Sequence, residues 1–339
     1  MERPFRRFAV NLSVGSLAGA FVITVILCGG LLVIFRWLHV ANEDWRRTSC
    51  SNKLRLLGAA TEAYQAQLGA LPPSVVGPDQ PTWAFFLWPY REAAPVRPDM
   101  PPDGKTAKTA ADPNPVADGK AAEKKPPPAD LSLVNRYDFR KACTDPDNAA
   151  LLAEMTWPGF FCPTRRAGIQ RVEVDGLSAQ PGDYACVGPP DGGDPFDPRS
   201  SAMLIVAEAP GGDATFTKVR GRTTRKDIID GLSVTAMIGE KHIVDDGLWN
   251  AALAIDGGDG PVMLGRPMYF TRLMGAVVDR SLATGPNDRS ATDLFGSWHP
   301  DVCLFLMGDG SVKELHHGTD RRVLSALAAR NDSAKSDGK

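Results

Sequence analysis

The sequence predicts an α+β protein: a long N-terminal helix, transmembrane at its start and amphipathic at its end, followed by a domain with an antiparallel β-sheet. Three observations predict this fold class. Residues 8–35 form an uncharged apolar run, residues 54–68 repeat buried-type side chains at helical spacing, and residues 302–315 have the pattern of a β-hairpin. Gly and Pro, 33 and 28 of 339 residues, exceed their usual share and indicate many turns.

The composition excludes several classes of protein. Apolar residues make up 43% and charged residues 23% of the chain, which fits neither a wholly disordered chain nor a polytopic membrane protein. The 38 basic and 40 acidic residues give a net charge of −2. Such a chain has no global positive field to hold nucleic acid, so we expect no nucleic-acid partner.

The apolar run predicts a membrane anchor at residues 8–38, preceded by a short N-terminus at residues 1–7. A helix of 28 uncharged residues is about 42 Å long, more than the bilayer's hydrocarbon core of about 30 Å. A cleaved signal peptide and a buried helix are the alternatives, but signal peptides usually have a shorter apolar region. We therefore expect lipid contacts through residues 8–38 and a single-pass location in the cytoplasmic (inner) membrane.

Residues 42–94 are expected to hold an amphipathic helix and the first part of the domain. Leu54, Leu57, Thr61, Tyr64 and Leu68 follow one another at spacings of three and four, which places them on one face of a helix. This face is expected to pack on the domain core.

Residues 95–130 form a predicted disordered insertion. The segment has nine prolines and no aromatic residue, so it has too little apolar surface to offset the entropy of ordering. Residues 131–330 are expected to form the rest of the domain, with helices at 148–155 and 321–330 and a strand at 203–208. Residues 331–339 are expected to be a disordered tail.

The clearest hairpin lies near the end of the chain. Residues 302–307 are wholly apolar and suit a central strand, and residues 311–315 suit the returning strand. Asp309 and Gly310 between them predict a two-residue turn, because glycine tolerates a positive φ.

Several segments together resemble the bacterial prepilin-type H-X9-DG family, which is pseudopilin-like and of unknown function. His299 is followed by nine residues and then Asp309-Gly310, the spacing for which the family is named. The segments with this resemblance are residues 49–54, 71–73, 83–90, 137–139 with 147–148, 161–166, 182–185, 228–242 and 295–312. The residues that match its motifs include Cys50, Cys162, Asp230, Gly231, Glu240, His242, His299, Asp309 and Gly310.

The resemblance implies a pseudopilin-like fold, with a long N-terminal helix against an antiparallel sheet. It also implies that the domain lies outside the cytoplasm and that residues 1–7 lie in the cytoplasm. The sequence departs from the family at its leader. Residues 6–11 have neither the Gly before Phe8 nor the Glu at the fifth position of the run. We therefore expect the N-terminal span to stay uncleaved.

Two polar pairs are candidates for chemistry. One hypothesis is that His299 and Asp309 form a catalytic dyad. However, a strand between them, which rises about 3.3 Å per residue, would place them at its opposite ends. Glu240 and His242 are two residues apart, so a strand would place them on one face, as a hydrogen-bonded pair or as two ligands of a metal. We expect structural roles for all four and no catalytic residue.

The acidic loop at Asp191, Asp194 and Asp197 is a weak calcium candidate. Calcium binds six to eight oxygen ligands, and carboxylates supply them. The EF-hand spacing is absent, and loops of Gly, Asp and Pro are usually turns. We therefore expect no metal and no cofactor.

The cysteines leave two alternatives open. Five of the six lie outside the apolar run, without CxxC or zinc-type spacing. In an exported domain these cysteines would form up to two disulfides. The alternative is that they are buried free thiols.

The function expected from these observations is a non-enzymatic, membrane-anchored structural or assembly component of an extracytoplasmic secretion or cell-surface system. Its expected partners are pseudopilin-like or secretion-assembly proteins. One alternative is an anchored extracytoplasmic module that binds a small ligand or glycan through the loops around Asp191 and Asp256. A third alternative is an uncharacterised hydrolase.

Overall fold

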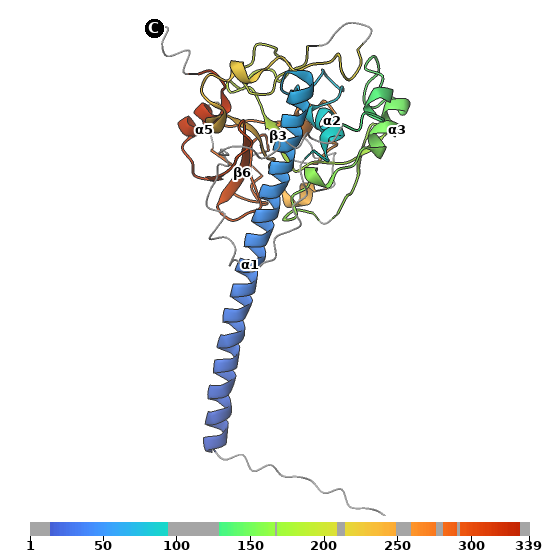
Figure 1. Cartoon of the computed structure of the whole chain (residues 1–339). Coiled ribbons are helices and arrows are strands. Elements are labelled where there is room, and N and C mark those ends of the chain that lie inside the picture. The colour runs from blue at the N-terminus through green and yellow to red at the C-terminus, as the bar shows by residue number, and fades with distance from the viewer. Residues whose placement is uncertain are drawn as a thin grey trace, which may run out of the picture. The chain divides into compact units, whose positions relative to one another are not determined.

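A computed structural model describes residues 14–93, 129–166, 168–208, 214–248, 259–275, 281–289 and 292–332. The chain forms two compact units, residues 1–45 and residues 46–339, and the second unit contains both β-sheets (Figure 1). The helices are α1 (Val14–Leu68), α2 (Trp83–Leu87), α3 (Pro146–Glu154), α4 (Pro267–Phe270) and α5 (Arg321–Ala328). The strands are β1 (Val172–Val174), β2 (Leu177–Ala179), β3 (Tyr184–Val187), β4 (Ala236–Glu240), β5 (Thr271–Arg272), β6 (Val302–Met307) and β7 (Val312–His316). Single 3₁₀ turns lie at Trp88–Tyr90, Val134–Arg136, Pro158–Phe160, Arg225–Asp227, Leu232–Val234 and Asp245–Gly247.

Three of the predicted segments lie almost wholly outside the described residues. They are the cytoplasmic N-terminus at 1–7, the Pro-rich insertion at 95–130 apart from its last two residues, and the tail at 331–339 apart from its first two.

Among the described residues, the main sheet has five strands in the order β5-β3-β4-β6-β7. Neighbouring strands are antiparallel except for β3 and β5, which are parallel, so the predicted antiparallel sheet is mixed at this edge. The crossover to β5 arises because a long connection, which includes β4, separates it from β3. The predicted central strand is confirmed, since β6 pairs with β4 on one side and β7 on the other. Strands β1 and β2 form a separate hairpin.

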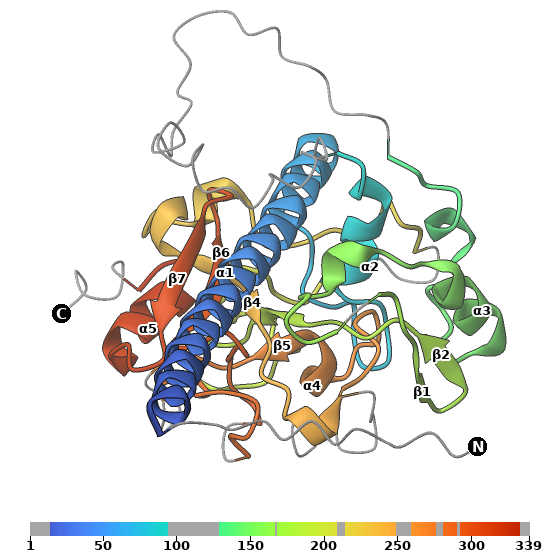
Figure 2. The ribbon, with the colours of Figure 1, turned by 90° about the horizontal axis from the view of Figure 1, so that it is seen from below.

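Both faces of the sheet are covered. Side chains alternate along β6, so Leu304 and Leu306 join one core, whereas Cys303, Phe305 and Met307 join another. The first core contains the buried face of α1, and the second contains residues of α5. Figure 2 shows β6 and β7 side by side with α5 close to them. The sheet is therefore the middle layer of the domain.

Helix α1 packs on the sheet through the face that the sequence predicted. Leu54, Leu57 and Tyr64 have no exposed surface. Burial of each such side chain stabilises the fold by about 1.5–3 kcal/mol. At Gly58 a β-carbon would lie 3.0 Å from the Leu306 side chain and 3.5 Å from the Gly310 Cα atom. The absence of a side chain at Gly58 thus lets α1 approach the β6–β7 hairpin closely.

The prediction of a membrane-spanning helix is wrong for the described part of the chain. Among those residues, no helix is both long enough and apolar enough to cross a bilayer. The second half of α1 is amphipathic, because exposed charged side chains such as Arg55 and Glu62 alternate with the residues that pack on the sheet, and charges are costly inside a bilayer. The same finding corrects the predicted single-pass location in the cytoplasmic membrane. Residues 8–13 of the predicted span lie outside the described residues.

Two predicted helices are confirmed, and one predicted strand is wrong. Helix α3 begins after Asp145, whose side chain accepts a hydrogen bond from the Asp147 N–H, and α5 begins after Asp320. Residues 203–207 are buried and Glu208 is exposed, but residues 203–208 form no strand of either sheet. Their backbone bonds to a loop instead: Ser74 N–H donates to Ile205 O, and Ala207 N–H donates to Val75 O.

The β6–β7 turn is longer than predicted. Leu306 pairs with Val312, and Met307 N–H donates to Ser311 O, so Gly308, Asp309 and Gly310 form a three-residue loop. Gly310 N–H donates to Met307 O, and Gly310 has a φ of 84°. This is a type I turn followed by a left-handed residue, the commonest three-residue hairpin loop.

Gly310→Ala is expected to destabilise the domain by about 1–2 kcal/mol, because an alanine is strained at this left-handed φ. The nearest atom to a new β-carbon would be Glu62 Oε1 at 3.8 Å, so the loss of stability would come from backbone strain and not from a steric clash. Gly77→Ala is the matched control, since its β-carbon would have only ordinary contact, with Gln80 Cγ at 3.8 Å. Urea melts measure both variants, and an equal loss of stability in the two would contradict the turn assignment.

Candidate functional site

A buried carboxylate at the start of β3 organises the candidate site. Asp183 has no exposed surface, and its Oδ2 accepts a hydrogen bond of 2.7 Å from the Cys162 N–H. Its backbone joins two further segments, because Asp183 N–H donates to Phe160 O and Lys241 N–H donates to Asp183 O. This one residue thus links the loop at 160–162 to strands β3 and β4.

Two consecutive arginines neutralise this carboxylate. Arg166 binds Asp183 through Nε and Nη2 at 2.5–3.0 Å, and its Nη1 donates to Asp259 Oδ2 at 2.6 Å. Arg165 donates to Asp183 O at 3.0 Å and to Gly296 O at 2.6 Å. Burial disfavours the charged form of Arg166, but Asp183 and Asp259 outweigh it and raise its pKa above the ordinary value. The pairs are fully buried, so the loss of one partner would leave a charge without compensation.

Lys241 lies at the edge of this network. Its Nζ is 3.9 Å from Asp259 Oδ1, and within the described chain it donates no hydrogen bond. Burial is the main cause that lowers the pKa of Lys241 to about 7, against an ordinary value of 10.5. A neutral amine is therefore accessible near physiological pH, although the side chain is fully buried.

The two polar residues of the H-X9-DG motif lie apart. His299 precedes β6 and is 1% exposed, whereas Asp309 follows β6 and is exposed in the turn. Asp309 Oδ1 accepts hydrogen bonds from Ser311 N–H at 2.9 Å and from Ser311 Oγ at 2.6 Å. The geometry therefore gives Asp309 a turn-forming contact and separates it from the imidazole.

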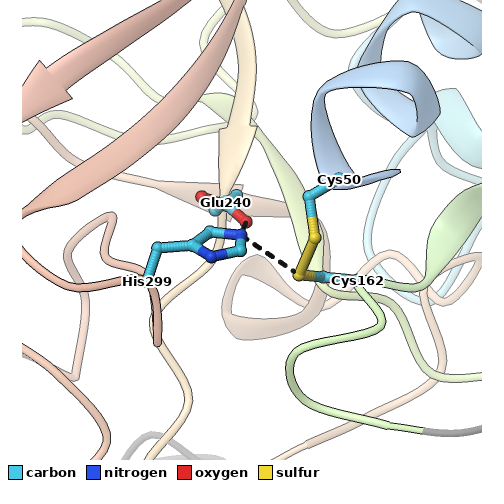
Figure 3. Close-up of side chains that lie close together, drawn as sticks. All are labelled: Cys50, Cys162, Glu240 and His299. Atoms are coloured by element: carbon cyan, nitrogen blue, oxygen red, sulfur yellow. Dashed lines mark hydrogen bonds and ion pairs between the residues drawn. A yellow bond between two sulfur atoms is a disulfide. The ribbon is translucent and has the colours of Figure 1, made fainter. Parts of the chain in front are cut away.

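His299 instead joins a cluster with Glu240, Cys50 and Cys162, which Figure 3 shows in close-up. Cys50 of α1 and Cys162 form a disulfide that closes a segment of 112 residues. His299 Nε2 lies 3.7 Å from Cys162 Sγ and 3.5 Å from Glu240 Oε1. All four residues are buried, and one ligand-type atom from each lies within 4.8 Å of the others. The disulfide alternative for these two cysteines is thus realised, while Cys143, Cys186 and Cys303 are buried free thiols.

The other predicted pair separates as well. Glu240 Oε2 accepts a 2.9 Å hydrogen bond from Leu304 N–H, whereas His242 Nε2 lies 2.8 Å from Asp288 O. Burial is the main cause that lowers the pKa of His242 to about 4, so the imidazole is neutral at physiological pH.

Asp230 and Gly231 lie in a turn that holds the C-terminal segment. Asp230 Oδ2 accepts a hydrogen bond of 2.7 Å from Asp332 N–H, and Gly231 has a φ of 108°. These motif residues therefore contact the chain just after α5 and lie outside the buried cluster.

The acidic loop forms the rim of a solvent-exposed hollow of about 380 Å³. Its three carboxylates bond within the loop: Asp191 accepts from Gly193 N–H, Asp194 from Phe196 N–H, and Asp197 from Arg199. The hydrogen bonds from Arg199 lower the pKa of Asp197. These are contacts of turns, and Asp256, the other loop position named above, lies outside the described residues.

The site contains residues that sequence reasoning did not select. Arg165, Arg166 and Asp183 lie in two of the segments that resemble the prepilin-type family, so a signal for them existed. Asp259 had no such signal, because it is 93 residues from Arg166 and lies in a loop of Gly and Asp residues.

Together these features define an α+β domain in which a buried disulfide and an ion-pair network fasten a long helix to a mixed sheet. A model of the family described as "Protein of unknown function (DUF1559)" matches residues 41–322, and the chain belongs to this family. The match gives no activity. No curated protein and no solved structure matches the chain.

Asp183→Asn is expected to destabilise the domain by about 3–5 kcal/mol, because it removes the charge that faces Arg166 in a buried pair. Asp309→Asn is the matched control: the exposed amide oxygen can still accept the Ser311 hydrogen bonds, so a much smaller change is expected. Guanidinium melts of both variants measure the difference. The network would have no special role in stability if the two losses were equal.

Proposed function

We propose that the protein is a non-enzymatic structural or assembly component of an extracytoplasmic secretion or cell-surface system. One observation carries the proposal: the motif residues at the centre of the domain are buried and bonded to other parts of the fold. Asp183 bonds to Cys162 and Arg166, and Glu240 bonds to Leu304. Contacts of this kind fix the backbone, and they favour a scaffold over a reaction site.

The disulfide supports a location of the domain outside the reducing cytosol. Structural disulfides persist in oxidising compartments and are rare where glutathione keeps thiols reduced. Cys50–Cys162 joins α1 to the loop before β1, and both residues are fully buried. The bond is therefore placed to stabilise the packing of the helix on the domain.

The resemblance to prepilin-type proteins supports an assembly role rather than an isolated one. Its segments follow one another in order from residue 49 to residue 312. In that family a long N-terminal helix is combined with a sheet domain. The packing of the second half of α1 on β6 agrees with such a combination.

Site-specific photo-crosslinking in cells tests the proposal. Benzoylphenylalanine replaces Ile229 or Val323, two apolar residues with 64% and 50% of their surface exposed. Exposed apolar side chains are favourable contact points for a partner. We expect a discrete cross-linked product with a second envelope protein from at least one of these positions. Glu173, exposed on the β1–β2 hairpin, is the matched control position.

Two outcomes would contradict the proposal. One is the absence of any intermolecular product at Ile229 and Val323 in cells that produce the folded protein. The other is a turnover activity that His299→Gln abolishes while the melting temperature stays unchanged, which would make His299 part of a reaction site.

A binding module for a small ligand or glycan is the second candidate function. The hollow beside the acidic loop favours it, since its polar lining includes Arg199, Ser201 and Asn331. A panel of neutral and acidic oligosaccharides should then raise the melting temperature of the protein, and Arg199→Ala should remove the shift. A panel without effect would leave this candidate without support.

A further inference from the structure

We propose that Cys50, Cys162, Glu240 and His299 form a Zn²⁺ site when the Cys50–Cys162 disulfide is reduced. The oxidised chain then has the disulfide and no metal at this cluster, and the reduced chain binds Zn²⁺ there. The inference is independent of the assembly role proposed above, because it rests only on the donor atoms of this cluster and their geometry.

The donor set is one that zinc prefers. Structural zinc sites are tetrahedral and take thiolate sulfur, imidazole nitrogen and carboxylate oxygen. The cluster offers two thiols, one imidazole and one carboxylate, and their ligand atoms all lie within 4.8 Å of one another. Each of the four side chains is at most 1% exposed, so bulk water would not compete with them as a ligand of the metal.

The distances match two edges of such a tetrahedron. With Zn–S near 2.3 Å and Zn–N and Zn–O near 2.0–2.2 Å, neighbouring ligand atoms lie about 3.3–3.8 Å apart. Cys162 Sγ is 3.7 Å from His299 Nε2, and His299 Nε2 is 3.5 Å from Glu240 Oε1. Only the edge between the two sulfurs is bonded, and reduction allows it to lengthen.

Glu240 supplies the second, independent indication of a ligand. Its side chain is fully buried, and Oε2 accepts the hydrogen bond from Leu304 N–H. Within the described part of the chain Oε1 accepts no hydrogen bond, and it points to His299 Nε2, as Figure 3 shows. A backbone donor therefore orients the carboxylate and leaves one oxygen for a metal, as outer-shell partners do in known metal sites.

The imidazole has a comparable arrangement. Nε2 is the ring nitrogen that faces both Cys162 and Glu240, while Nδ1 lies 3.4 Å from Thr164 Oγ1. Thr164 Oγ1 also lies 3.5 Å from Nε2, so the assignment of Nε2 as the ligand atom depends on its short distances to Cys162 Sγ and Glu240 Oε1.

The chemistry balances as a two-electron reduction followed by metal binding. A small dithiol reductant gives two electrons and two protons to the disulfide, which becomes two thiols, and the reductant is oxidised to its own disulfide. Zinc binding then releases two protons from the thiols to solvent, because thiolates are the ligands. With the Glu240 carboxylate and a neutral imidazole, the site carries a net charge of −1.

The test uses the full chain with Cys28→Ser, because Cys28 is an exposed thiol that would bind metal on its own. The protein is reduced with a dithiol under nitrogen, freed of reductant and titrated with Zn²⁺ against a chromogenic chelator. Co²⁺ titration then reports tetrahedral thiolate ligation through its visible absorption. We expect one metal ion per reduced chain and none per oxidised chain.

Variants in this background identify the ligands. Glu240→Gln keeps the hydrogen bond to Leu304 and should lower zinc affinity by about tenfold or more, and His299→Gln should do the same. Cys186→Ala, which removes a buried thiol outside the cluster, is the matched control and should leave the affinity unchanged. Near-ultraviolet circular dichroism verifies that each variant is folded.

Three results would overturn the proposal. They are equal zinc binding by oxidised and reduced chains, an affinity unchanged by both Glu240→Gln and His299→Gln, and a reduced chain that unfolds and is not refolded by zinc.

Discussion

The buried carboxylate of Asp183 is the constraint on which the rest of the domain depends. It compensates the charge of Arg166 and fixes the backbone of Cys162 at the same time. Without this carboxylate, the Cys162 N–H would lose its acceptor, and Arg166 would lose one of the two buried carboxylates that pair with it. The backbone bond from Asp183 N–H to Phe160 O would remain. Cys162, the disulfide partner of Cys50, is thus bonded to the same carboxylate that pairs with Arg166.

The disulfide links the loop that Asp183 holds in place to helix α1. Cys50 lies on the part of α1 that packs on β6, so the bond acts on the same surface as the apolar contacts of Leu54 and Leu57. A cross-link over 112 residues restricts the unfolded chain strongly. Glu240 and His299 complete the surroundings of the two sulfurs, which is why one cluster serves both the proposed scaffold and the proposed zinc site.

Local patterns allowed part of this fold to be predicted from the sequence. The α1 face and strand β6 follow from periodicity over a few residues, whereas the turn after β6 was predicted one residue too short. The predicted membrane span was wrong, because no helix among the described residues is both long enough and apolar enough to cross a bilayer. Only the second half of α1 is amphipathic and packs on the sheet. The pairing of Arg166 with Asp259, 93 residues away, and the four-residue cluster arise only from the tertiary fold, which no spacing rule captures.

The central claim is that Asp183, Glu240 and the residues bonded to them form a buried scaffold that fastens α1 through the Cys50–Cys162 disulfide. Disulfide mapping by mass spectrometry of the air-purified, metal-free protein tests it most directly. The account predicts one cross-linked peptide pair that contains Cys50 and Cys162, with Cys143, Cys186 and Cys303 alkylated only after unfolding. A native protein in which Cys50 is alkylated, or in which Cys162 is linked to another cysteine, would contradict the account.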